Sequence, residues 1–141
     1  MKISWIICII LITAAALSAQ GPFCSNQTSA GTYAVTCSGW VAAGPGGSLV
    51  PVMHVGIATG DESGNWIGTT TVNIAGQTTF TAAVTGKAVT NSDCTGSVTY
   101  NKGTPNEMNV TYVVLRDKGE TRGLITDKGQ VVTCVLTRIS K

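Results

Sequence analysis

The sequence predicts an all-β domain that closes as an eight-stranded antiparallel up-and-down barrel. Three observations lead to this fold class. After residue 19 the chain shows no sustained helical periodicity, it contains eight short runs rich in Val, Ile, Thr, Tyr and Trp, and turn residues with many glycines separate those runs. Such a composition favours strands joined by short turns.

A predicted export signal precedes this domain. Lys2 is followed by an apolar stretch over residues 3–16 and by a small-residue site that ends at Ala19, the order typical of a secretory signal peptide. We expect residues 1–19 to be removed and residues 20–141 to form a single secreted domain, extracellular or periplasmic. The alternative is an uncleaved membrane anchor, because the apolar stretch approaches the length that spans a bilayer.

The eight expected strands are bounded by turn residues. They are residues 31–42, 51–59, 65–74, 77–86, 95–101, 108–117, 120–127 and 130–139. The connections between them are short, which favours antiparallel pairing of neighbours. Only residues 43–49, with their glycines and Pro45, are typical of a long flexible loop.

Three turns predict which side chains face inward. Ala75-Gly76, Lys118-Gly119 and Lys128-Gly129 each supply a glycine where a two-residue loop needs positive φ, and such a loop determines which residues face each other. The last two turns place these residues on one apolar face: Tyr112, Val114, Ile125, Val132 and Cys134. The first turn aligns a second set that we expect to face inward: Ile67, Phe80, Ala82 and Val84.

The cysteines favour closure of the sheet over an open sheet or a sandwich. Four cysteines follow the predicted leader, and an even number in an oxidising compartment favours two disulfides. In a closed barrel Cys37 on the first strand and Cys134 on the last become neighbours, so a disulfide between them would join the seam and leave Cys24 to pair with Cys94. The rival pairing is Cys24 with Cys37 and Cys94 with Cys134.

We expect no catalytic, cofactor or metal site. The only histidine, His54, alternates with Met53, Val55 and Ile57, so it faces solvent if those apolar residues face inward. No cysteine or acidic residues have the spacing of a zinc site or an EF-hand. Most of the acidic residues fall at predicted turns, where they are solvated: Asp61, Glu62, Asp117, Glu120 and Asp127.

The charge balance argues against a nucleic-acid partner. Without Lys2 the domain carries eight basic and seven acidic side chains, and no basic cluster of the kind that follows a phosphate backbone. Two glycosylation sequons begin at Asn26 and Asn109, and they matter only in a eukaryotic secretory pathway.

The interior of the barrel is the first candidate site, because eight strands enclose a space that side chains fill or that holds one small ligand. The possible lining residues are Tyr33, Val35, Ile67, Phe80, Val84, Tyr112, Val114, Ile125 and Val132. We therefore expect a non-catalytic barrel that binds a small apolar molecule or a surface partner. A carbohydrate-binding or adhesive module is the alternative in which Trp40, Trp66 and Tyr100 form an exposed patch.

Five short motifs are spread over most of the chain after residue 19. They are Cys24-Ser25-Asn26, Gly31-Thr32-Tyr33, Gly60-Asp61-Glu62-Ser63-Gly64-Asn65, Asn91-Ser92-Asp93-Cys94-Thr95-Gly96 and Arg122-Gly123-Leu124-Ile125-Thr126-Asp127. Together they resemble a group of small uncharacterised secreted bacterial proteins. The resemblance implies an eight-stranded barrel broadly similar to those of allene oxide cyclases and dirigent proteins, and it adds a barrel that guides a reactive small molecule as an alternative function. It assigns no functional residue, and this chain departs from the group at Cys37 and Cys134.

Overall fold

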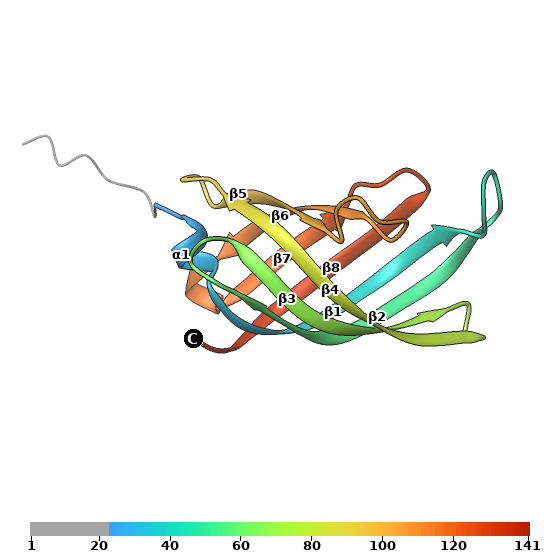
Figure 1. Ribbon diagram of the computed structural model, residues 1–141, viewed down its shortest axis with the longest axis horizontal. Helices are drawn as coiled ribbons and strands as arrows, with labels where there is room; N and C mark the ends of the chain where they lie inside the picture. Colours follow the sequence, from blue (N-terminus) through green and yellow to red (C-terminus); the bar gives the residue numbers. More distant parts are fainter. Residues whose placement is uncertain (1–22) are drawn as a thin grey trace, which may run out of the picture.

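The computed structural model describes residues 23–141, so the predicted signal peptide lies outside the described part. Over these residues the chain forms one closed antiparallel barrel whose strands follow one another in sequence order, as the sequence predicts (Figure 1). The strands are β1 (Gly31–Ala42), β2 (Leu49–Gly60), β3 (Asn65–Ile74), β4 (Thr78–Thr90), β5 (Thr95–Tyr100), β6 (Met108–Leu115), β7 (Glu120–Ile125) and β8 (Gln130–Ser140). Two short helical turns, α1 (Asn26–Ser29) and η1 (Arg116–Lys118), were not expected because a single turn shows no periodicity.

The two ends of the barrel differ, and we call them the closed end and the open end. The closed end, at the left of Figure 1, holds α1 and the turns that join β2 to β3, β4 to β5 and β6 to β7. The open end holds the loops 43–48, 75–77, 101–107 and 126–129. The chain also ends at the closed end, so α1 and the end of β8 lie near each other.

The hairpins among β6, β7 and β8 keep the predicted inward face. The turn at residues 128–129 gives the expected pairs, with Ile125 opposite Val132. Between β6 and β7 the loop is two residues longer than predicted because η1 occupies it, so Tyr112 lies opposite Gly123 instead of Ile125. A shift of two residues leaves the direction of every side chain unchanged, which is why the inward face survives.

The β3–β4 hairpin contradicts the predicted inward face. Its turn contains three residues, 75–77, and the Gly76 N–H donates to Oδ1 of Asn73 at 3.0 Å. This one-residue shift reverses the direction of every β3 side chain, so Ile67 lies outside with 63% of its surface exposed. On β4 the side chains of Phe80, Ala82 and Val84 face inward, as predicted.

Strand β2 also faces the other way from the expectation. His54 lies directly opposite Cys37 of β1 and shares its inward direction. Met53, Val55 and Ile57 lie on the outer wall, each more than half exposed. The prediction for β2 was wrong because it assumed that the apolar side of the strand faces inward. This barrel also has apolar residues on its outer wall.

Both disulfides of the closed-barrel pairing are present. Cys37 and Cys134 face each other across the β1–β8 seam and are bonded, at a sequence separation of 97. Cys24, ahead of α1, is bonded to Cys94 in the β4–β5 turn. The first disulfide joins the two ends of the sheet, and the second holds the N-terminal segment against the closed end.

We expect loss of the seam disulfide to destabilise the barrel strongly. Replacing both Cys37 and Cys134 with alanine should lower the free energy of unfolding by about 2–4 kcal/mol, because the disulfide closes a long loop of the unfolded chain. Urea denaturation of the variant and of the oxidised protein measures this difference. An unchanged unfolding midpoint, or non-reduced peptides that join Cys37 to Cys24, would contradict the assigned seam.

Candidate functional site

The barrel encloses a cavity in its middle, and this cavity is the candidate functional site. Its volume is about 70 Å³, against the roughly 10–15 Å³ that one water molecule needs. Aliphatic and aromatic side chains supply most of its wall. These include Val35, Ala58, Trp66, Val84, Val98, Tyr100, Met108, Val110, Tyr112 and Leu136, together with the Cys37–Cys134 disulfide.

The cavity continues into a larger trough at the open end. This trough has a volume of about 740 Å³ and shares with the cavity four lining residues: His54, Thr70, Val84 and Met108. It forms because β5 is short: the ladder between β4 and β5 begins at the pair of Gly86 with Tyr100 and leaves the first residues of β4 beyond the end of β5. The loop 101–107 borders the gap, so the lumen has an approach from this side.

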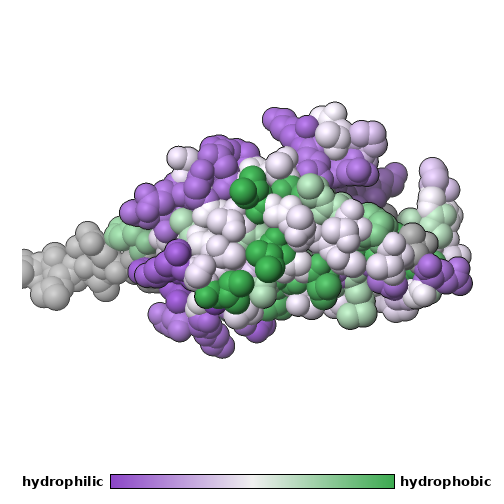
Figure 2. Space-filling model, turned by 60° about the horizontal axis from the view of Figure 1, so that its bottom comes forward, coloured by the Kyte–Doolittle hydropathy of each residue, from purple (hydrophilic) through white to green (hydrophobic). Residues whose placement is uncertain are grey.

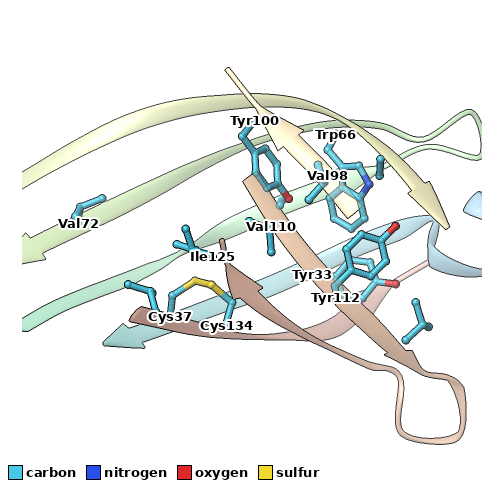
Figure 3. Close-up of a cluster of buried hydrophobic side chains, with 14 of the residues drawn as sticks. Tyr33, Cys37, Trp66, Val72, Val98, Tyr100, Val110, Tyr112, Ile125 and Cys134 are labelled. Atoms are coloured by element: carbon cyan, nitrogen blue, oxygen red, sulfur yellow. A yellow bond between two sulfur atoms is a disulfide. The ribbon is translucent and has the colours of Figure 1, made fainter. Parts of the chain in front are cut away.

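Aromatic rings fill the lumen on the side nearer the closed end, and glycines on neighbouring strands make room for them (Figure 3). Trp66 lies opposite Gly60 on β2 and Gly86 on β4. Gly86 in turn lies opposite Tyr100, where an added Cβ would come within 2.7 Å of the ring. Each large ring therefore lies next to a glycine, which has no side chain. The cavity is the part of the lumen that these rings do not fill.

A hydrogen-bonded network seals the closed end below the cavity. The Tyr33 hydroxyl, on a side chain only 1% exposed, donates to the Ser29 carbonyl of α1 at 3.0 Å. The Arg138 guanidinium donates to the same hydroxyl through Nε at 3.0 Å and Nη2 at 2.6 Å. Beside them the Tyr112 hydroxyl is hydrogen-bonded to the Thr90 hydroxyl at 2.7 Å. These bonds satisfy both tyrosine hydroxyls within the protein.

Tyr100 differs from the other two tyrosines. Its side chain is 9% exposed and lines the cavity, and burial raises the pKa of its hydroxyl. Within residues 23–141 this hydroxyl has no hydrogen-bond partner, and no side-chain nitrogen or oxygen that is fully buried lacks one. The Tyr100 oxygen therefore retains contact with open space. Figure 3 shows it directed into the barrel interior.

His54 is another polar side chain of the cavity wall without a partner among the described residues, as is the buried Thr121. The imidazole is half-buried between the cavity and the trough, and in the described part of the chain it makes no hydrogen bond or ion pair. Burial lowers its pKa below the usual value of 6.5. At neutral pH the ring is therefore uncharged, with one donor nitrogen and one acceptor nitrogen.

The structure distributes the nine predicted lining residues among four places. Val35, Val84 and Tyr112 line the cavity, and Phe80 lines the trough with 46% of its surface exposed. The core holds four others that do not reach the cavity: Tyr33, Val114, Ile125 and Val132. Ile67 lies on the outer wall, so its assignment to the interior was wrong, for the register reason given above.

Sequence reasoning missed the residues that give the cavity its polar character. His54 and Tyr100 lie on β2 and β5, and no two-residue turn was available to orient either strand. The alternative of an exposed aromatic patch is contradicted, because Trp66 is 6% exposed and Tyr100 is 9% exposed. Only Trp40 of that trio is open to solvent. The pairing of each buried ring with a glycine on the next strand was the signal that could have placed them inside.

The described residues contain neither a cluster of metal ligands nor a membrane-spanning helix. Between residues 23 and 141 no three His, Cys, Asp or Glu side chains come together as metal ligands, and no helix has the length and apolar character needed to cross a bilayer. The amide nitrogen of Asn26 donates to the Ala88 carbonyl, and that of Asn109 donates to Asp127 at 2.9 Å. Both sequon asparagines are therefore engaged within the fold.

Comparison with known proteins returned no relative. No family model, no curated protein and no solved structure matches this chain. The two intramolecular disulfides are consistent with a non-cytoplasmic protein. The geometry of the lumen is therefore the feature that indicates a function.

We expect His54 to make stability depend on pH below about 7. Because its pKa is lower in the folded state, the unfolded chain binds the proton first, and the free energy of unfolding falls as pH drops below about 6.5. Thermal unfolding at pH 7.5 and pH 5.5 should show a decrease of a few degrees that His54→Gln removes. The chain has no other histidine, and the lowered pKa values of Asp61 and Asp93 act at more acidic pH. An equal decrease in the variant would contradict the burial of His54.

We expect the tyrosine hydroxyls to contribute unequally to stability. Tyr33→Phe removes a buried hydroxyl with three hydrogen bonds and should lower the free energy of unfolding by about 1–3 kcal/mol. Tyr100→Phe removes a hydroxyl that has no partner and should change it by less than about 0.5 kcal/mol. Chemical denaturation of the two variants measures both values. A similar cost at the two positions would show that Tyr100 is satisfied within the protein.

Proposed function

We propose that this protein is a secreted, non-catalytic barrel that binds one small apolar molecule in its lumen. The observation that carries the proposal is the cavity inside the barrel, which has a mostly apolar wall and continues into the trough at the open end. The predicted leader and the two disulfides support a location outside the cytoplasm.

The wall of the cavity favours an uncharged ligand. Its lining residues include no Asp, Glu, Lys or Arg. Transfer of an unpaired charge into such a space is very costly, whereas transfer of apolar surface from water contributes about 25 cal/mol per Å². The closed barrel holds these walls in place before a ligand arrives, which reduces the entropy lost on binding.

The same wall favours binding over catalysis. The ionisable side chains in it are one histidine and the tyrosines Tyr100 and Tyr112, so a nucleophile, a base and an orienting acid do not come together there. A cyclase or dirigent-type barrel would need this lumen as well, since it would constrain a reactive molecule by shape. That alternative therefore depends on the same test.

Toluene is a suitable first probe because it is apolar and has seven heavy atoms. We expect saturable binding to the oxidised protein with a Kd on the order of 0.1–1 mM, from typical binding energies per ligand atom. Saturation-transfer NMR and titration calorimetry measure it. Val84→Phe should abolish binding by filling the cavity, whereas Val89→Phe on the outer face of the same strand should leave it intact.

Absence of toluene binding to the unmodified protein would overturn the proposal. Equal binding to the Val84→Phe and Val89→Phe variants would also overturn it, because the toluene would then lie outside the lumen. If Val84→Phe fails to fold, Val84→Ala enlarges the cavity instead, and it must then bind toluene more tightly.

A further inference from the structure

We propose that the ligand of the lumen is an uncharged, ring-sized molecule that carries one oxygen, such as a phenol or a cyclic ketone, and that this oxygen accepts a hydrogen bond from Tyr100. This inference rests on the proposed function and names the class of ligand. It distinguishes such molecules from plain hydrocarbons and from fatty acids, which are the other ligands that suit an apolar barrel.

The first observation is the unsatisfied hydroxyl of Tyr100. The chain contains three tyrosines, and the hydroxyls of Tyr33 and Tyr112 are both hydrogen-bonded within the protein. Tyr100 is nine-tenths buried and has no partner among the described residues, yet its ring lies on the cavity wall. A buried hydroxyl that loses its hydrogen bonds to water costs free energy, so a ligand oxygen that restores one binds more tightly.

The second observation is that His54 reaches the same cavity from another strand. Tyr100 is on β5 and His54 is on β2, and both line the space next to Val84 and Met108 where the trough joins it. The neutral imidazole offers one donor and one acceptor, and neither is used by the protein residues that are described. A few convergent polar groups in an apolar wall are what orient a ligand. A hydrocarbon would leave both groups unpaired.

The third observation is the size and charge of the space. A volume of about 70 Å³ corresponds to roughly five to seven times the space that one water needs. The cavity itself fits a single ring, and a longer acyl chain would have to extend into the trough. The cavity wall has no basic side chain, so a carboxylate inside the cavity would be an uncompensated charge. An uncharged ring with one oxygen meets both limits.

The experiment compares phenol with toluene, which differ by a hydroxyl in place of a methyl group. For the oxidised protein we expect phenol to bind at least as tightly as toluene, although phenol loses a more favourable hydration when it enters the cavity. In Tyr100→Phe the affinity for phenol should fall about ten-fold, while that for toluene should change less than two-fold. Tyr33→Phe is the control, because its hydroxyl is satisfied at the closed end and the phenol-to-toluene ratio should not change.

The outcomes separate this inference from the proposed function. If toluene binds and the ratio is the same in Tyr100→Phe as in the unmodified protein, the lumen binds ligands but the oxygen assignment is wrong. If neither probe binds, the proposed function fails as well. Should Tyr100→Phe fail to fold, the infrared carbonyl band of cyclohexanone bound to the unmodified protein gives the answer. A shift to lower frequency supports a hydrogen bond, and an unshifted band overturns it.

Discussion

The structure depends on the close approach of aromatic rings to glycines across neighbouring strands. Tyr112 lies between Gly96 and Gly123, and an added Cβ at Gly96 would lie 2.4 Å from the ring. Trp66 has the same relation to Gly60, where an added Cβ would lie 2.5 Å from the indole. Protein interiors pack to a nearly constant density. An eight-stranded barrel therefore has room for several aromatic rings only where the neighbouring inward positions are glycines.

This arrangement also explains where the cavity lies. The rings and the hydrogen-bonded network around Tyr33 and Arg138 take up the space inside the barrel next to α1. Farther along the barrel β5 ends at Tyr100 while β4 continues past it, so the cavity opens toward the trough. Tyr100 and His54 both line this part of the lumen.

Much of the fold could be predicted from the sequence, because strand boundaries follow from local chemistry. The runs 31–42 and 65–74 coincide with β1 and β3, and closure followed from placing Cys37 beside Cys134. The strand register was harder to predict, because an error of one residue in the length of a turn shifts it. The extra residue in the turn at 75–77 reversed β3, and with it the positions of Ile67 and Trp66. The cavity wall could be predicted only where the register was right.

The lack of charge on the outer wall of β1, β2 and β3 is a further reason for that ambiguity. Residues 31–60 and 65–86 contain no Asp, Glu, Lys or Arg, and apolar side chains such as Val55 and Ile67 lie outside among threonines. Figure 2 shows apolar and near-neutral side chains along the middle of the barrel, with hydrophilic ones mainly toward its ends. Polarity therefore does little to choose which face of β2 or β3 points inward. The ring–glycine pairs and the seam disulfide must make that choice, and these same residues shape the wall of the cavity.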